Sequence, residues 1–281
     1  MKILVATPFM SQHFDAGLFW VKALCNLDHS VILWDYRADP TRIVSVDGSV
    51  YDLAIVFKGE SVDPRLLHSP KVCYWPDALE RTPGIEETLR WYDKVFTPVR
   101  PTPDWMEWLP SGQDPAIHVD MKLVRNVDTI YVGTANSEYK IKTVEEIDPR
   151  WLFGNDWKRV NRWGDIIKPI YLHELVLTLN RAKILIDVHQ SPNVGVNRKL
   201  FEMIACGFTL VDSVPGVEEI FPDIWDQFTY GSPEHARELI QYYLKQGKSK
   251  EELWEQQKKA IEPYTYENCA RRLLECLRHV D

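Results

Sequence analysis

The stretch that decides the fold reads HQSPNVGVNRKLFEMIACGFTLVDSVPGVEEIF and runs from residue 189 to 221. It follows the apolar segment 182–189 and contains a glycine loop, a helix over 199–207 and a second strand over 208–212. Strand, helix and strand in this order predict a βαβ unit of a parallel sheet. Ligands of such sheets bind at the carboxyl ends of the strands, so the loop NVGVNRK is the first candidate site.

The chemistry of this loop favours an anion. The helix that opens near Lys199 presents free backbone N–H groups and the positive end of its dipole. Arg198 and Lys199 are unfavourable at a helix start unless an anion lies there. Glu202 permits two interpretations. Its carboxylate either accepts hydrogen bonds from a ribose diol or simply complements the helix dipole. At the other end of the helix, Gly207 is expected to act as a C-cap.

The rest of the chain repeats the alternation of strands and helices, which predicts an α/β fold with parallel sheets covered on both faces. A proline-rich stretch over 100–118 separates two such halves and is interpreted as the region between two domains. We expect strands over 3–9, 31–36, 51–59, 71–77, 94–99, 128–134, 150–154, 182–189 and 208–212. Helices are expected over 18–27, 85–92, 142–147, 171–180, 199–207, 233–246, 250–261 and 265–280, with a further helix start at Asp63-Pro64. The candidate site loops of the first half follow Pro8, Gly59, Trp75 and Thr97.

Composition narrows the functional classes. The 281 residues carry a formal net charge of −8, which argues against broad binding to nucleic acid phosphates. The five cysteines lack the spacing of a zinc site and are expected to be free thiols. The segment MKILVATPF lacks the features of a signal peptide, and no apolar run reaches the roughly 20 residues that span a bilayer. A cytoplasmic protein is therefore expected.

Several motifs resemble those of a known enzyme group. FEMIACG followed by FTLVDSVPGVEE is similar to the signature of group 1 glycosyltransferases. The segments NRKLFEMIACG, YWPD, WLPSGQDPAIH and TYENCARRLLECL look more specifically like the CgeB-like branch, named after a spore maturation protein. The resemblance touches both halves of the chain and is strongest over 189–221.

The resemblance implies a GT-B fold, in which two Rossmann-like domains with parallel sheets face each other across a cleft. It implies an acceptor-side domain over 1–120, a nucleotide-sugar domain over 121–264 and a C-terminal helix over 265–281 that crosses back to the first domain. The implied activity is metal-independent transfer of a sugar, with retention at the anomeric carbon, from a nucleoside-diphosphate sugar to an acceptor hydroxyl. The donor is expected to be a UDP-sugar, without a further cofactor.

The resemblance also assigns residues. Glu202 takes the ribose role, Asn197 to Lys199 bind the diphosphate, Gly216 to Glu219 line the sugar or diphosphate, and Gly133 lies beneath the phosphates. The full donor-binding set is expected to be Gly133, Lys158, Arg162, His189, Asn197, Arg198, Lys199, Glu202, Gly216, Glu218 and Glu219. The family's first glutamate falls at Val194, which leaves the sugar and the retaining outcome open, with His189 or Gln190 as substitutes.

The residues expected to bind the acceptor lie in the first half of the chain. Asp77 ends the YWPD strand and either handles the acceptor hydroxyl or caps the next segment. His13 is a second catalytic candidate, and Asp15 and Gly17 lie in the same expected loop. Trp157 and Trp163 either stack on a ligand or pack in the core. The acceptor stays open among a small molecule, a glycan, a protein and a modified DNA base. Three other functions remain: hydrolysis or epimerisation of the sugar nucleotide, a non-catalytic nucleotide-binding scaffold, and a phage-type transferase that acts on modified DNA bases.

Overall fold

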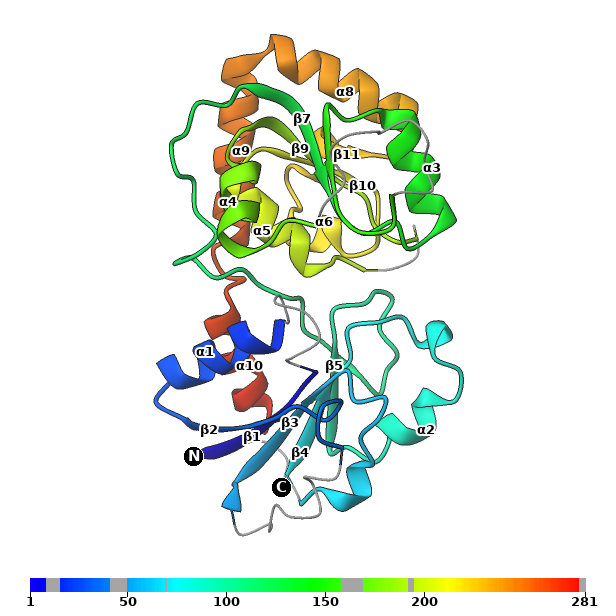
Figure 1. The fold of residues 1–281 in the computed structure, drawn as a ribbon, viewed down its shortest axis with the longest axis vertical. Coiled ribbons are helices and arrows are strands. Elements are labelled where there is room, and N and C mark those ends of the chain that lie inside the picture. Colours follow the sequence, from blue (N-terminus) through cyan, green and yellow to red (C-terminus); the bar gives the residue numbers. More distant parts are fainter. Residues whose placement is uncertain (9–15, 41–49, 69, 158–168, 192–194, 278–281) are drawn as a thin grey trace. The chain divides into compact units, whose positions relative to one another are not determined.

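The computed structural model describes residues 1–8, 16–40, 50–68, 70–157, 169–191 and 195–277. The chain divides into two compact units (Figure 1). Unit 1 comprises Met1–Ser111 and Tyr266–Asp281, and unit 2 comprises Gly112–Thr265. Within the described ranges, none of the helices has both the length and the apolar character needed to cross a membrane.

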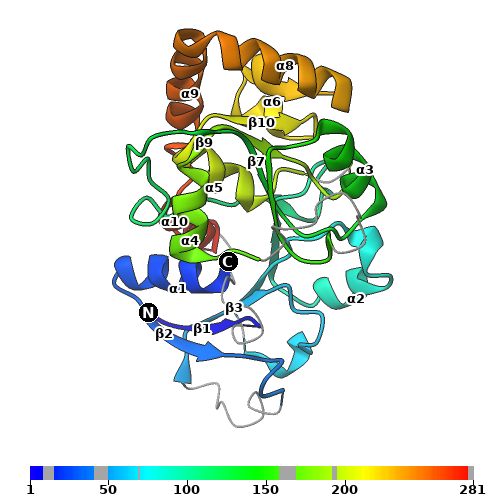
Figure 2. The ribbon, with the colours of Figure 1, turned by 45° about the horizontal axis from the view of Figure 1, so that its top comes forward.

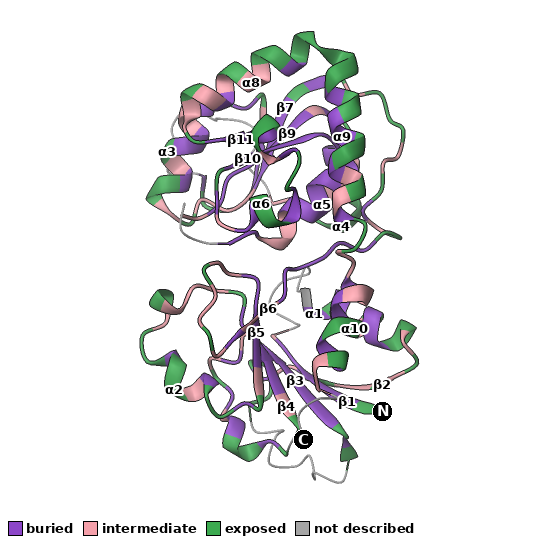
Figure 3. Ribbon diagram, turned by 180° about the vertical axis from the view of Figure 1, so that it is seen from behind, coloured by how far each residue is buried: buried purple, intermediate pink, exposed green. Residues whose placement is uncertain are grey.

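Unit 1 is built on a six-stranded parallel sheet in the order β2-β1-β3-β4-β5-β6. Both faces of a parallel sheet are covered, so its buried strands appear in the sequence as near-continuous apolar runs. Figure 3 shows the central strands β1, β3, β4 and β5 as largely buried, whereas the edge strand β2 is partly exposed. The strands are β1 (Lys2–Ala6), β2 (Ser30–Trp34), β3 (Leu53–Phe57), β4 (Lys71–Tyr74), β5 (Lys94–Thr97) and β6 (Glu107–Trp108).

The helices of unit 1 pack on the two faces of this sheet. Helices α1 (Ala16–Asn26) and α10 (Tyr266–Leu277) lie side by side, as Figures 1 and 2 show. Aromatic rings hold them together: Phe19 stacks on Tyr266 at 5.0 Å between centroids. The other face carries α2 (Ile85–Leu89), and short 3-10 helices occupy Pro64–Leu66 and Leu79–Arg81.

Unit 2 has a five-stranded parallel sheet in the order β11-β10-β9-β7-β8. Helices α4, α5 and α9 pack together, and α3 packs against α8 (Figure 1). The strands are β7 (Val127–Val132), β8 (Trp151–Phe153), β9 (Ala182–Asp187), β10 (Thr209–Asp212) and β11 (Thr229–Tyr230). The helices are α3 (Glu138–Ile147), α4 (Leu172–Leu179), α5 (Arg198–Cys206), α6 (Val217–Ile220), α7 (Trp225–Phe228), α8 (Pro233–Lys245) and α9 (Gly247–Ile261).

The order of strands places a topological switch point in each sheet. In unit 2, β7 pairs with β8 on one side and with β9 on the other. The connections that leave these strands therefore diverge at the carboxyl ends of β7 and β9, which is where open parallel sheets bind their ligands. In unit 1 the corresponding point lies between β1 and β3.

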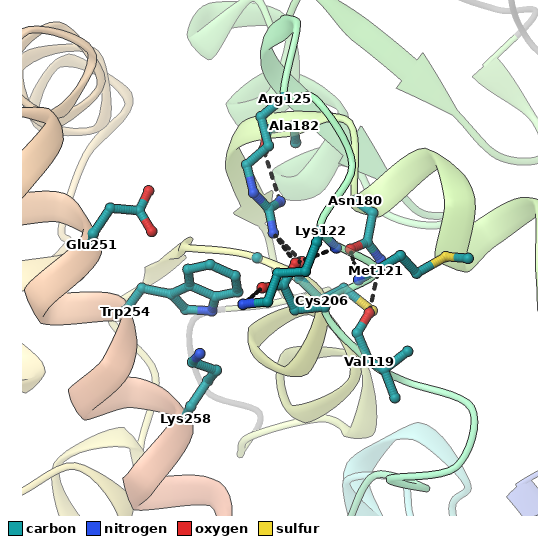
Figure 4. Close-up of polar contacts among 12 residues, drawn as sticks. Val119, Met121, Lys122, Arg125, Asn180, Ala182, Cys206, Glu251, Trp254 and Lys258 are labelled. Atoms are coloured by element: carbon teal, nitrogen blue, oxygen red, sulfur yellow. Dashed lines mark hydrogen bonds and ion pairs between the residues drawn. The ribbon is translucent and has the colours of Figure 1, made fainter.

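The connecting segment, defined here as residues 112–126, packs on unit 2. Figure 4 shows Arg125 donating hydrogen bonds to the carbonyl oxygens of Ala182 at 3.1 Å and Cys206 at 2.8 Å. The side chain of Asn180 bonds the backbone of Met121 at 2.7 Å. Because of these contacts, the division between the units falls after Ser111 and not after residue 120 as expected from the sequence.

Most expected strands and helices are present, with informative differences at their ends. Helix α3 begins at Glu138 and not at Lys142, because the Ser137 side chain caps it by accepting from the Lys140 N–H. Gly207 has a φ of −175°, so it is an extended residue and not a left-handed C-cap. Gly17 lies in helix α1 and not in a loop. All five cysteines are free thiols.

Candidate functional site

Lys199 occupies the switch point of unit 2. Its Nζ donates to the carbonyl oxygen of Val132, the last residue of β7, at 3.0 Å. The same nitrogen lies 2.7 Å from the carboxylate of Asp187, the last residue of β9. Burial opposes the charge on both partners, but their mutual attraction outweighs it. The pKa of Lys199 is raised and the pKa of Asp187 is lowered.

A second buried pair lies beside the first. The backbone N–H of His189 donates to Asp212, the last residue of β10, at 2.9 Å, and its Nδ1 lies 2.6 Å from the same carboxylate. The other ring nitrogen, Nε2, accepts the backbone N–H of Asn197 at 3.2 Å. Nδ1 therefore carries the proton in the neutral ring. Burial lowers the pKa of His189, but Asp212 and Asp187 outweigh it and the pKa is raised.

These contacts fix the start of helix α5. Asn197 is the N-cap, and its side chain accepts from the Leu200 N–H at 3.3 Å. The backbone N–H of Asn197 is thus bound by His189, and that of Leu200 is bound by the Asn197 side chain. The first-turn N–H groups of Arg198 and Lys199 follow the cap at the positive end of the helix dipole. The start of α5, where the sequence predicts an anion site, is therefore held by two side-chain hydrogen bonds.

Glu202 lies one turn further along α5 and is 5% exposed. Its Oε1 is 3.8 Å from Arg198 and 3.9 Å from Nε2 of His118. His118 comes from the connecting segment, and its Nδ1 accepts the Asp114 N–H at 3.1 Å. Burial lowers the pKa of His118, against the raising effect of Glu202 and Asp114. Helix α5 and the connecting segment thus meet at Glu202.

Gly133 directly follows β7 and has no room for a side chain. A Cβ there would lie 2.4 Å from the Tyr131 hydroxyl and 3.3 Å from Nζ of Lys199. The carbonyl oxygen of Gly133 accepts the indole N–H of Trp157 at 2.6 Å. Trp157 is fully buried, so its role is packing. Gly133 therefore lies beside Lys199 at the switch point.

The second glycine loop lies elsewhere on the carboxyl side of the sheet, after β10. Gly216 is the N-cap of α6 and has a φ of 93°, which a glycine adopts without strain. Glu218 and Glu219 lie in the first turn of this four-residue helix and are exposed. Their position at the positive end of the helix dipole explains their charge without a ligand.

The carboxyl edge of unit 1 carries the candidate Asp77. Its two carboxylate oxygens lie 3.2 Å from Nζ of Lys58 and 3.1 Å from Nη1 of Arg81. Lys58 adopts a positive φ of 69°, which is uncommon for a residue other than glycine and often accompanies functional loops. At Gly17, a Cβ would lie 2.6 Å from Thr7, so the glycine lets α1 approach β1.

Four predicted site residues lie outside the described residues: His13, Asp15, Lys158 and Arg162. Val194 and Trp163 lie outside them as well. Asp187, Asp212 and His118, in contrast, belong to the site and were missed from the sequence. Asp212 could have been found because it ends the expected strand 208–212, and Asp187 because it is the acidic residue near the end of the expected strand 182–189. His118 could not have been found, because its partner Glu202 is distant in sequence.

Clusters of three or more His, Cys, Asp and Glu side chains suited to a metal ion are absent among the residues that the structure describes. The groups brought together at the switch point are instead paired cations and carboxylates beside a helix start. Such an arrangement suits a phosphate-bearing ligand, with a buried carboxylate one turn away.

Comparisons with family models and with solved structures find similar proteins. A family model described as glycosyl transferase-like matches residues 139–275. A comparison with curated proteins gives no match. T4 phage BGT, solved with UDP-glucose, is similar with a TM-score of 0.69 and 13% identity, over 100% of this chain and 99% of that one.

Two further structures of the same type are similar. HepE of Anabaena, solved with UDP and glucose, has a TM-score of 0.72 and 11% identity, with 99% of each chain covered. Sucrose-phosphate synthase of Thermosynechococcus elongatus has a TM-score of 0.68 and 10% identity, over 99% of this chain and 98% of that one. These likenesses confirm the expected GT-B fold.

Proposed function

We propose that this chain transfers a sugar from a UDP-sugar to an acceptor hydroxyl. The observation that carries the proposal is the built site at the switch point of unit 2, where Lys199, Asp187 and the start of α5 meet. The GT-B fold and the glycosyl transferase-like match over 139–275 support it. Solved structures with this fold, T4 phage BGT and HepE, contain UDP-glucose or UDP with glucose.

The donor is placed by helix α5. The diphosphate lies at the first-turn N–H groups, where the helix dipole and Arg198 supply positive charge. Lys199 is neutralised by Asp187, so it mainly holds the ends of β7 and β9 together beneath the phosphates. Glu202 accepts hydrogen bonds from the ribose diol, since its carboxylate makes only ion-pair contacts longer than 3.5 Å among the described residues.

The transfer forms a bond between the acceptor oxygen and the anomeric carbon, and it breaks the bond from that carbon to the β-phosphate oxygen. UDP leaves with its negative charge stabilised by preorganised donors and not by a metal ion. Lys58 and Arg81 occupy both oxygens of Asp77. Asp77 therefore orients the acceptor hydroxyl, and the proton passes to the leaving phosphate oxygen. This route implies retention of the anomeric configuration, which the proton coupling constant of the product reads directly.

The first test is binding of nucleoside diphosphates by calorimetry and thermal unfolding. We expect UDP to bind, and a concentration 100 times its dissociation constant stabilises a folded protein by about 2.7 kcal/mol. Glu202→Gln should weaken UDP binding about tenfold, because it removes a charged acceptor of the ribose hydroxyls. Glu238→Gln is the matched control on an exposed turn of α8 and should bind UDP normally.

Failure of every nucleotide to bind would contradict the proposed function. Binding of UDP without turnover of UDP-sugars, with and without Mn²⁺, would instead identify a non-catalytic scaffold.

The motifs NRKLFEMIACG and TYENCARRLLECL lead us to place the chain in the CgeB-like branch. A sequence alignment with that branch tests this placement by matching Asn197, Arg198 and Glu202.

A modified DNA base is a second candidate acceptor. The observation that favours it is the likeness to T4 phage BGT, a DNA-modifying enzyme, over the full length of this chain. The net charge of −8 opposes a large DNA interface. Transfer to a duplex whose bases carry an added hydroxyl group, measured beside transfer to small alcohols, distinguishes the two acceptors.

A further inference from the structure

Three buried groups in contact connect the end of β10 to the start of helix α5. Asp212 accepts from the backbone N–H of His189 at 2.9 Å and lies 2.6 Å from Nδ1 of its ring. The opposite ring nitrogen, Nε2, accepts the backbone N–H of Asn197, the N-cap of α5, at 3.2 Å. His189 is 1% exposed and Asp212 is 2% exposed, so the contacts lie away from water. The position of the N-cap therefore depends on the ring.

The ring makes both contacts in only one protonation state. In the neutral ring Nδ1 carries its proton toward Asp212, and Nε2 keeps the lone pair that accepts the Asn197 N–H. A second proton, on Nε2, would place two N–H donors against each other across 3.2 Å. The Asn197 N–H would then lose its acceptor in a buried place, which is strongly unfavourable. The protonated ring and the present position of the N-cap therefore exclude each other.

The charges around the ring favour that second proton. Asp212 at the end of β10 and Asp187 at the end of β9 attract it, whereas Lys199 of α5 opposes it. Tyr139 of α3 lies 3.4 Å from Asp212 and stays neutral, because its pKa is raised to about 12. The two carboxylates outweigh Lys199 and the burial of the ring, so the pKa of His189 is raised above its ordinary value of 6.5. The chain without donor therefore takes up this proton at a higher pH than an exposed histidine does.

The proton has two opposite effects on a diphosphate at the start of α5. It adds a positive charge, but that charge lies in contact with Asp212 and is largely offset by it. It also removes the hydrogen bond that holds Asn197, so the first-turn N–H groups lose their fixed direction. Preorganised donors bind an anion well because they need no rearrangement, and the proton removes this advantage. The loss of the hydrogen bond therefore decides the direction of the effect.

We propose that Asp212 and His189 form a positioning pair for the donor. The neutral ring holds the start of α5 in the form that binds the diphosphate, and the protonated ring releases it. Proton and donor then oppose each other, so donor binding expels the proton. This role rests on the proposed function, because it requires a nucleotide-sugar at the start of α5. The effect of the proton on the N-cap does not require a donor.

The test uses the full chain and UDP-glucose, whose phosphates do not titrate between about pH 5 and 8, unlike the terminal phosphate of UDP. Calorimetry should show an affinity that falls with pH, by up to about tenfold per pH unit below the pKa of His189. Titrations at one pH, in buffers that differ in ionisation enthalpy, count the protons. The wild type should release up to about one proton on binding.

Two variants separate the role of the proton from a purely structural role. His189→Gln should bind UDP-glucose without pH dependence and without proton release, because its amide oxygen still accepts from Asn197 and does not titrate. Asp212→Asn should move the fall in affinity to lower pH, because it removes the nearest carboxylate from the ring. A purely structural role would weaken binding equally at every pH. His173→Gln, exposed on α4, is the matched control and should keep the wild-type profile.

A second readout needs no donor. The backbone amide shift of Asn197, followed by NMR over the same pH range, should titrate in the wild type and stay constant in His189→Gln. His118, beside Glu202, is the other buried histidine of the site, and burial lowers its pKa. Its own titration therefore lies below that of His189, and His118→Gln should leave the upper fall in affinity in place.

An affinity that stays constant or rises as the pH falls would overturn the positioning pair and leave the proposed function standing. A wild-type profile in His189→Gln would overturn the pair as well. A wild-type profile in Asp212→Asn would overturn it even where His189→Gln fails to fold. Titration of the Asn197 amide without binding of UDP-glucose at any pH would overturn the proposed function, and the proton-dependent start of α5 would stand.

Discussion

Lys199 connects two neighbouring strands with one amine, because its Nζ contacts both Val132 and Asp187. Asp187→Asn removes the counter-charge of a largely buried cation and should lower the free energy of unfolding by about 3 kcal/mol. Urea denaturation measures this loss. Tyr131→Phe is the control, because the buried Tyr131 hydroxyl has no hydrogen-bond partner among the described residues. It should change stability by less than about 0.5 kcal/mol, and a larger loss would reveal a missed partner.

The buried ring of His118 leads us to expect that the stability of the folded chain depends on pH. Burial lowers its pKa in the folded chain, so the native state holds the neutral ring. The unfolded chain takes up the proton near pH 6.5, so the stabilisation is complete above that pH and is lost as the pH falls through the lowered folded pKa. His118→Gln should flatten this acid loss of stability. Exposed His68→Gln should keep the wild-type slope, and equal slopes in both variants would contradict the prediction.

Arg125 holds the end of the connecting segment on unit 2 through several contacts. The Arg125 guanidinium bonds two carbonyl oxygens, pairs with Asp120 at 3.2 Å and lies 4.6 Å from the centroid of the Trp254 ring (Figure 4). Arg125→Lys keeps the charge but not the planar fork, so the free energy of unfolding should fall by about 2 kcal/mol. Denaturant titration measures it. Lys122→Ala, at a side chain that is 79% exposed, should cost almost nothing.

At the scale of elements, the apolar runs predicted the long strands, because buried parallel strands are apolar on both faces. The two-residue strands β6 and β11 are too short to show a pattern of apolar residues in the sequence, and they form only by pairing with β5 and β10. Gly207 shows a similar limit. Its role depends on tertiary contacts, because a Cβ there would lie 2.9 Å from Arg125 and 3.1 Å from Leu185. The loop and helix of the candidate site were predicted, but the pairings of Lys199 and His189 were not.

At the scale of the whole molecule, the two units differ in continuity. Unit 2 is one stretch of chain, whereas unit 1 needs α10 from beyond unit 2. Residues 112–265 expressed alone should therefore unfold cooperatively in urea, monitored by circular dichroism. Residues 1–111 alone should not, because α10 buries Leu273 and Tyr266 against the rest of unit 1. Fusing 266–281 ahead of 1–111 through a flexible linker should restore cooperativity, and failure of that fusion would count against the division.

The interruption of unit 1 also sets an order of events on the ribosome. Residues 1–111 emerge first, yet the helix that covers Phe19 and Trp20 emerges only after all of unit 2. At typical synthesis rates this delay is roughly ten to thirty seconds. During that time the aromatic face of α1 is exposed to water and to chaperones, while unit 2 is already able to fold. The half of the molecule that is translated first is therefore the last to be completed.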